Sequence, residues 1–399
     1  MKLTRIFALI GICGAASFWT HIGQAQIQPP AGKTTGPGVQ AAQDSKETDV
    51  LKTCKGPPPA GRGGRGAAGR GPAPVTGPRD YTVTAIDGVI AAGQKWTEVL
   101  PVDGNNADGI IATKDGGIFM AQNDASDIVK LDRKGKMSVV YSGLNTSGSL
   151  ALNSKGVLFV ANRGLNESID ELAPQRKPFA TKINGDPLDC IGGVLNDISA
   201  DSKGGVYFTM GGLFYADPKG NVTRYGQNLG TNGIILTADE KHVYVTNGPT
   251  LAAFDVQPDG SLTNQREFAK LEGGGNGDGS TFDAAGRLYV SSNPGVQVFS
   301  PDGKYLGLIP TPRGIISLAF SGPARKTLYA VVREGATNKD WIISIPTLAQ
   351  GPKGRAKYRR LAHASCRETV KAVRKLVAGS QGQADIMSKL QEALWNIQS

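Results

Sequence analysis

The sequence has few of the residues that many catalytic and metal sites use. Its 399 residues include 3 His and 4 Cys, and neither a C-x-x-C nor a G-x-S-x-G motif occurs. These absences argue against a zinc site built from His and Cys and against a Ser-His-Asp hydrolase with a nucleophile elbow. After residue 26, no apolar run approaches the length of about eighteen residues that a membrane span requires.

Turn-forming residues, in contrast, are abundant. The chain has 54 Gly and 23 Pro, with 39% hydrophobic and 20% charged residues. It is too apolar for a disordered chain and too rich in glycine for a coiled coil or a helical bundle. The composition predicts an all-β fold with many tight turns.

Residues 1–25 resemble an export signal. Lys2 and Arg5 precede a mostly apolar stretch, and a small-residue cleavage site ends at Ala25. We expect cleavage there and a periplasmic or secreted protein, the alternative being a single membrane anchor. Residues 26–79 are predicted to be a flexible linker, because their Gly-, Pro- and Arg-rich part cannot bury a core. Its Arg-Gly repeats could also contact RNA or an anionic surface.

The charge is segregated along the chain. The formal net charge is +10, yet residues 80–352 contain 24 Lys and Arg against 28 Asp and Glu. The excess of positive charge lies in the flanking segments, whereas a nucleic-acid enzyme carries its basic patch on the folded body. We therefore expect no nucleic-acid partner. Residues 352–399 are predicted to be a basic tail with two short amphipathic helices.

Three cysteines remain once Cys13 leaves with the signal. At most one intramolecular disulfide can then form, with one thiol left over. Cys54 and Cys366 lie in the two flanking segments, and we predict that they pair with each other, which leaves Cys190 free.

A repeated unit organises the region from about residue 100 to 335. It has an apolar strand, a polar turn and a second strand with an aromatic residue, a pattern typical of β-hairpins. Five copies and a looser sixth begin at Asp108, Gly148, Asn196, Asn232, Asp278 and Gly314. Six such units predict a six-bladed β-propeller over residues 80–351. Segments that start at Trp96 and Trp341 are expected to supply the outer strands that close the ring.

The register of the repeat predicts a metal site. Four copies place an oxygen-bearing side chain eight residues before the turn position, which is Gly in three copies and Glu240 in the fourth: Asp108, Asn196, Asn232 and Asp278. If the first strand of each blade is innermost, these side chains converge on the central channel. Carboxylate and amide oxygens suit Ca²⁺, although another divalent cation would also fit. The alternative is that these residues only form turns.

Four of these segments resemble the family that groups gluconolactonase, senescence marker protein (regucalcin) and luciferin-regenerating enzyme. They begin at Asn196, Asn232, Asp278 and Leu318, and the resemblance covers roughly residues 95–335. It implies a calcium-dependent six-bladed propeller. The Glu, two Asn and Asp that hold Ca²⁺ in the family correspond to Asp108, Asn196, Asn232 and Asp278. The family's lactone-hydrolysing members carry an Arg where this sequence has Val194.

Together these features predict an exported, gluconolactonase-like, metal-dependent hydrolase of lactones or related esters. Ca²⁺ would polarise the carbonyl and Asp278 would assist the attack of water. We expect Asn196, Arg163 and Asn123 to contact the small-molecule substrate. The alternatives are a Ca²⁺-stabilised propeller that acts as a binding scaffold and a phosphotriester hydrolase of the same architecture. The substrate and the oligomeric state remain open.

Overall fold

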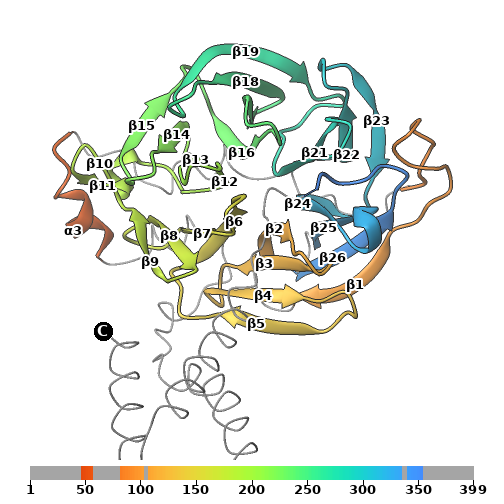
Figure 1. The fold of residues 1–399 in the computed structure, drawn as a ribbon, viewed down its shortest axis with the longest axis horizontal. Helices are drawn as coiled ribbons and strands as arrows, with labels where there is room; N and C mark the ends of the chain where they lie inside the picture. The colour runs from red at the N-terminus through yellow and green to blue at the C-terminus, as the bar shows by residue number, and fades with distance from the viewer. Residues whose placement is uncertain (1–45, 57–80, 103–106, 335–338, 354–399) are drawn as a thin grey trace, which may run out of the picture. The chain divides into compact units, whose positions relative to one another are not determined.

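Six four-stranded antiparallel sheets surround a common axis in the computed structural model, which describes residues 46–56, 81–102, 107–334 and 339–353 (Figure 1). The predicted six-bladed β-propeller is thus confirmed. The predicted export signal, and all but the first two residues of the predicted tail, lie outside the described residues. Among the described helices, none is long and apolar enough to cross a lipid bilayer.

The first three blades are each built from consecutive strands. Blade one contains β2 (Ala107–Ala112), β3 (Ile118–Gln122), β4 (Asp127–Leu131) and β5 (Met137–Tyr141). Blade two contains β6 (Ser147–Leu152), β7 (Leu158–Asn162), β8 (Ser168–Ala173) and β9 (Lys177–Ala180). Blade three contains β12 (Ile198–Ala200), β13 (Val206–Thr209), β14 (Leu213–Ala216) and β15 (Val222–Tyr225).

Blades four and five repeat this order, and the sixth closes the ring. Blade four contains β16 (Thr231–Leu236), β17 (His242–Asn247), β18 (Thr250–Val256) and β19 (Leu262–Lys270). Blade five contains β20 (Ser280–Phe282), β21 (Leu288–Ser292), β22 (Gly295–Phe299) and β23 (Tyr305–Pro310). Blade six combines β24 (Gly314–Ser321), β25 (Thr327–Glu334) and β26 (Lys339–Pro346) with β1 (Thr97–Val102).

The ring closes through strands from opposite ends of the propeller. β1 pairs antiparallel with β26, with Thr97 opposite Ser344 and Val102 opposite Asp340. Both predicted closing segments therefore form one outer edge of blade six. The indole N–H of Trp96, just before β1, donates to the carbonyl oxygen of Pro310 at 2.8 Å and so fixes β1 to blade five as well.

The first strand of every blade lines the axis. β2, β6, β12, β16, β20 and β24 lie against one another in that circular order. The turn after the first strand uses the residues that the sequence predicted: Gly116, Gly204 and Gly286 have φ of +86°, +108° and +79°, which L-residues rarely adopt. In blade four the same place is taken by Glu240, with φ of +58°. Its carboxylate accepts from the Ser202 N–H at 2.8 Å and hydroxyl at 2.7 Å, so it anchors this turn to blade three.

Apolar side chains fill the space between and within the blades. In blade three, Phe208 stacks on Phe214 at 5.1 Å between ring centroids, and Tyr207 stacks on Tyr215 at 4.4 Å, with all four rings buried. Offset aromatic pairs add to the free energy gained from burial of their surface. This packing fixes the angle between neighbouring blades and thereby the positions of the strand ends at the axis.

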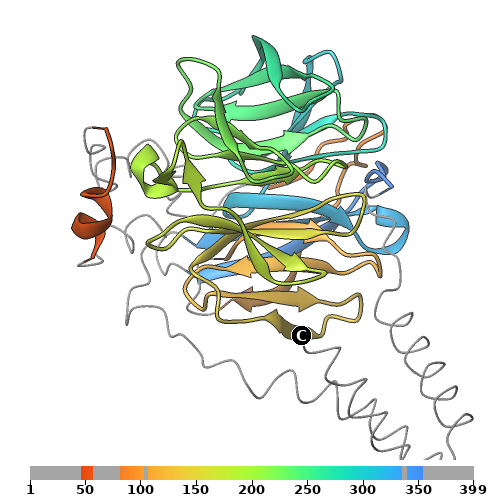
Figure 2. The ribbon, with the colours of Figure 1, turned by 60° about the vertical axis from the view of Figure 1, so that its left-hand side comes forward.

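Part of the predicted linker is structured. Residues 46–56 include helix α3 (Glu47–Leu51), which lies beside the short hairpin β10 (Lys182–Ile183) and β11 (Asp186–Pro187) (Figures 1 and 2). Two short 3₁₀ helices complete the described elements, η2 (Leu188–Ile191) and η3 (Pro323–Arg325).

A disulfide joins Cys54, just after α3, to Cys190 in η2. The predicted Cys54–Cys366 pair is therefore wrong, because Cys54 is already bonded. The Lys55 backbone N–H adds a hydrogen bond to Asp186 at 3.2 Å, and its ammonium donates to the Asn184 carbonyl oxygen at 3.0 Å. The prediction paired Cys54 with Cys366 because both lie outside the propeller in the sequence. In the structure, residues 46–56 instead fold back beside the hairpin that precedes blade three.

Candidate functional site

Four polar side chains predicted from the repeat stand at the axial end of four different blades. Asp108 lies in β2 and Asn232 in β16. Asn196 and Asp278 lie two residues before β12 and β20, and their backbone N–H groups donate to the carbonyl oxygens of Thr209 and Ser291 at 2.8 and 3.0 Å. All four are partly exposed to solvent.

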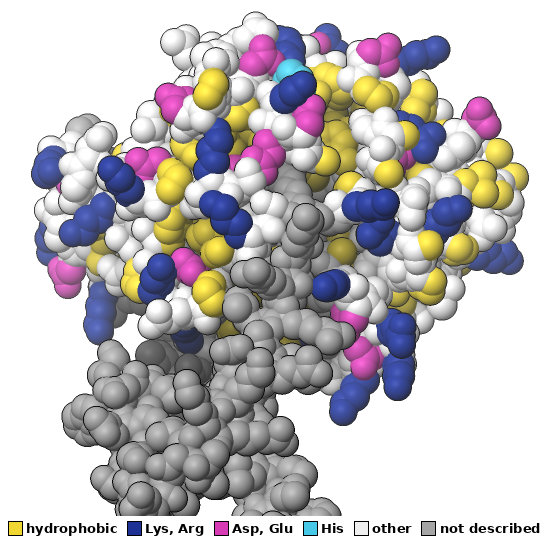
Figure 3. Space-filling view, in the orientation of Figure 1, with side chains coloured by type: hydrophobic (Ala, Val, Ile, Leu, Met, Phe, Trp, Pro, Cys, Tyr) yellow, Lys and Arg dark blue, Asp and Glu magenta, His cyan; other side chains and the backbone are white. Residues whose placement is uncertain are grey.

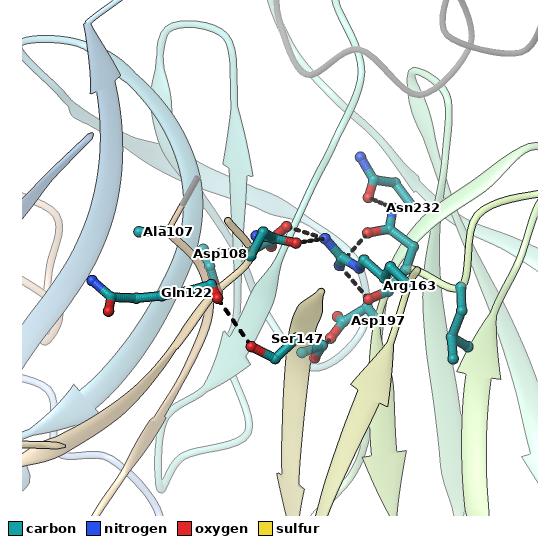
Figure 4. Close-up of polar contacts among 12 residues, drawn as sticks. Ala107, Asp108, Gln122, Ser147, Arg163, Asp197 and Asn232 are labelled. Atoms are coloured by element: carbon teal, nitrogen blue, oxygen red, sulfur yellow. Dashed lines mark hydrogen bonds and ion pairs between the residues drawn. The ribbon is translucent and has the colours of Figure 1, made fainter. Parts of the chain in front are cut away.

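The guanidinium of Arg163, which follows β7, lies among these side chains (Figure 4). Its Nη1 forms an ion pair with the Asp108 carboxylate and donates to Asn123 Oδ1 at 3.3 Å. Its Nη2 donates to both the carbonyl oxygen and Oδ1 of Asn196, the latter at 2.8 Å. Arg163 is only 2% exposed, so a cation belonging to the chain itself holds together side chains from three blades.

The remaining guanidinium nitrogen of Arg163, Nε, makes no hydrogen bond to the described residues. This nitrogen is buried. An unsatisfied buried donor costs on the order of 1–3 kcal/mol. The terminal nitrogens must therefore supply the interactions that keep this side chain at the axis.

Gly148 provides the space for Arg163. Gly148 lies in β6, at the position where other blades carry an acid or amide, and a Cβ there would overlap Nε, Cζ and Cδ of Arg163. The break in the repeat that the sequence displays at blade two is thus a steric requirement. The long side chain of Arg163, from the same blade, occupies the space that a side chain at residue 148 would need.

Amide groups extend the network into blade four. Asn196 Nδ2 donates to Asn232 Oδ1, so the two predicted amide ligands contact each other (Figure 4). The neighbouring Asp197 accepts from Ser149 Oγ at 2.5 Å and from the Ile234 N–H at 2.9 Å. Asp197 therefore links the first strands of blades two and four through blade three, which fixes the direction of Asn196.

Asp278 differs from the other three residues. Its carboxylate makes no hydrogen bond within the described part of the chain. Burial raises its pKa well above the ordinary value, and the negative charges of Asp108 and Asp197 raise it further, while Arg163 and Arg333 oppose this shift. Asp278 thus lies in a region of negative potential where a carboxylate favours either a proton or a nearby cation.

The structure brings the predicted site residues together. Asp108, Asn196 and Asn232 are joined directly or through Arg163, and Asp278 is close enough to interact electrostatically with Asp108 and Arg163. Arg163 and Asn123 were predicted to contact substrate. That role stays a prediction; in the structure both are buried and bonded to each other, at 2% and 1% exposure. Val194, where the resemblance led us to look for an arginine, is partly exposed next to Asn196.

Sequence reasoning missed Asp197 and the pair Arg333–Asp340. The sequence feature that could have revealed Asp197 was its position directly after the predicted ligand Asn196. Arg333 donates to Asp340 through Nε at 2.7 Å and Nη2 at 3.0 Å. Arg333 lies near the end of β25 and Asp340 near the start of β26, and the two residues are opposite each other in this antiparallel pair. Only knowledge of the strand pairing could have revealed them.

The donor set fits a hard divalent cation in its chemistry. Two carboxylates and two amide oxygens come from four blades, and such hard oxygen donors suit a divalent cation. Arg163 uses oxygens of Asp108 and Asn196, and Asn232 Oδ1 accepts from Asn196. Asp108, Asn196, Asn232 and Asp278 are the residues that would hold the ion.

Residues 141–333 match the family model described as SMP-30/Gluconolactonase/LRE-like region. This part of the chain is similar to that family, and the match covers just under half of the chain. The SMP-30/gluconolactonase/LRE-like region includes Arg163, Asn196, Asn232 and Asp278, whereas Asp108 lies before it. Blades two to five and part of six therefore carry the family's features.

Individual proteins also resemble this chain over the propeller. A gluconolactonase from Zymomonas mobilis is 26% identical over 216 residues, which cover 46% of this chain and 60% of the relative. A gluconolactonase structure from Xanthomonas campestris has a TM-score of 0.57 at 20% identity and covers 69% of this chain and 98% of that one. The calcium-binding protein regucalcin from Agrobacterium tumefaciens has a TM-score of 0.51 at 16% identity and covers 64% and 94%. The two structures establish the likeness of fold.

Proposed function

We propose that this protein hydrolyses lactones or related esters at the propeller axis with the help of a bound divalent cation, Ca²⁺ in the first place. The observation that carries the proposal is the convergence of Asp108, Asn196, Asn232 and Asp278 from four blades. The names of the matched gluconolactonases and of calcium-binding regucalcin support it.

In the proposed reaction, a water molecule adds to the lactone carbonyl carbon and the ring C–O bond breaks. Asp278 accepts the proton of the water and returns a proton to the leaving alkoxide, so that a hydroxy acid is released. Its carboxylate makes no hydrogen bond within the described part of the chain, so its oxygens are available to a water molecule. When bound, the divalent cation supplies polarisation of the carbonyl oxygen.

The other residues of the site hold the polar groups at the axis in fixed positions. Asn196 and Asn232 present amide oxygens from neighbouring blades, and the hydrogen bond between them keeps these side chains at a fixed separation. Asp197 holds the backbone of blade four through the Ile234 N–H at 2.9 Å. Because these groups come from packed strands, they are preorganised before a substrate arrives.

We also propose that the protein is exported. The signal-like residues 1–25 support this, as does the Cys54–Cys190 disulfide, because structural disulfides persist mainly in oxidising compartments. On the face in Figure 3, the described Lys and Arg side chains are scattered among acidic and apolar ones. This distribution supports a small molecule rather than a nucleic acid as the partner.

A binding or scaffold role is the second candidate. It is favoured by Arg163, whose bonds to Asp108 and Asn196 already occupy two of the four axial side chains without any ligand. In that case the axial residues would serve to stabilise the ring.

A lactone assay separates the two functions. Purified protein is tested by pH-stat on a panel of sugar lactones, aliphatic lactones and aryl esters, with EDTA and after return of Ca²⁺, Mg²⁺, Mn²⁺ or Zn²⁺. We expect EDTA to abolish hydrolysis and D278N to lower kcat by roughly 100-fold or more. The control D259N changes an exposed turn carboxylate and should leave kcat unchanged. No hydrolysis of any substrate with any metal would contradict the enzyme proposal and leave the scaffold.

A further inference from the structure

We propose that Arg163 is a built-in competitor for the axial cation site, so that a divalent ion binds only when the guanidinium leaves Asp108 and Asn196. This inference rests on the proposed metal site and assigns to Arg163 a specificity-determining role that the substrate-anchor prediction did not include. It is argued from the contacts, the charge balance and the steric fit of this one side chain.

The contacts of Arg163 are those that an ion would need. Its two terminal nitrogens bond to Asp108 Oδ2 and Asn196 Oδ1. These oxygens are two of the four proposed ligands. A guanidinium and a metal ion cannot both take the same lone pairs of these oxygens at close range, so the two cations exclude each other there.

The charge balance also makes Arg163 a substitute for a metal. Asp108 is the acid that pairs directly with Arg163, and Asp197 directly follows the other partner of Arg163, Asn196. The other arginine that acts on Asp278 is Arg333, and it is already paired with Asp340. Arg163 is thus the cation that pairs with Asp108 at the axis, and its removal would leave that carboxylate without its ion-pair partner.

The steric fit shows that the chain is built to admit this side chain. A Cβ at Gly148 would overlap Arg163, and the three atoms nearest to such a Cβ all belong to Arg163. The φ of Gly148 is outside the range that only glycine favours. Alanine is therefore compatible with the backbone of residue 148 but not with Arg163 in its present place.

Calcium binding to chelator-treated full-length protein tests the competition. Isothermal titration with Ca²⁺ is performed on the wild type, R163Q, and the control R266Q, which removes an equal charge from a partly exposed arginine of blade four. Since ligand charge tunes Ca²⁺ affinity, we expect R163Q to bind roughly tenfold tighter or more, and R266Q to change Kd less than about twofold. Equal or weaker binding by R163Q, or no binding by either protein, overturns the proposal.

The steric part is tested separately by melting temperature. G148A should lower Tm by about 3 °C in the wild-type background and by much less in the R163A background, because alanine lacks the atoms that overlap a Cβ at residue 148. An equal loss in both backgrounds overturns the assignment of Gly148 as the space for Arg163. If R163Q binds Ca²⁺ tightly while the wild type hydrolyses no lactone, the competition stands and the proposed function fails. If the wild type hydrolyses lactones and R163Q binds no tighter, the reverse holds.

Discussion

The buried carboxylate of Asp340 accepts a hydrogen bond from the backbone N–H of Ala107, with 2.7 Å between Oδ2 and the nitrogen. Asp340 lies in the third strand of the last blade and Ala107 begins the first strand of the first blade. The bond therefore fixes the residue next to Asp108 at the seam where the ring closes. Arg333 neutralises Asp340 from the adjacent strand.

We expect D340N to destabilise the protein by about 2 kcal/mol, because it leaves the partly buried Arg333 without its counter-charge. Urea unfolding followed by tryptophan fluorescence measures the loss. D302N, which changes an exposed turn residue between β22 and β23, serves as the control. A free energy of unfolding unchanged within about 0.5 kcal/mol would show that the seam does not depend on this ion pair.

A second prediction concerns Asp127, at the start of β4. Burial raises its pKa from 3.8 to about 6, and its Oδ1 has no hydrogen bond among the described residues. Between these two pH values the folded chain holds a proton that the unfolded chain releases. The stability contributed by Asp127 is therefore present at low pH and is lost as the pH rises through about 6.

D127N removes this titration. Relative to wild type, it should be nearly neutral at pH 4 and more stable by about 1 kcal/mol at pH 7.5, a value reduced from the full shift because the residue is partly exposed. D217N should behave in the opposite way. Hydrogen bonds from Asn221 and Lys219 outweigh the burial of Asp217 and lower its pKa. Parallel stability curves for wild type and D127N between pH 4 and 7.5 would contradict the prediction.

A third prediction follows from the disulfide. Cys54 and Cys190 are separated by 136 residues, so the crosslink restricts a long loop in the unfolded chain. The C54S/C190S variant should lose about 2–4 kcal/mol of unfolding free energy. Dithiothreitol should lower the stability of the wild type by a similar amount and leave the variant unchanged. Equal sensitivity of both proteins to the reductant would point to another cause.

The ring and the axial register were predictable because they repeat. Asp108, Asn196, Asn232 and Asp278 occur at one offset from a turn, and every copy of the unit reports the same geometry. Periodicity of this kind averages over the irregularities of single blades, which is why even Glu240 could be assigned to its turn.

The position of Arg163 could not be predicted in the same way. It follows the second strand of its blade, and its path to the axis depends on the absence of a side chain at Gly148, fifteen residues earlier. Only blade six has a comparable pair, Gly314 opposite Arg333, and there the arginine bonds to Asp340 instead. The Cys54–Cys190 pair was missed for a related reason, since a segment that belongs to no repeat carries no register of its own.

The Cys54–Cys190 bond also has a consequence for the integrity of the molecule. Proteolysis at a single site between these two cysteines would leave both fragments covalently attached, and the N-terminal piece with α3 would stay bound beside blade three. Such a nick would escape detection on a gel run without reductant and appear as two bands once thiol is added. Loss of the N-terminal piece would thus require two chemical events, scission of the backbone and reduction of sulfur.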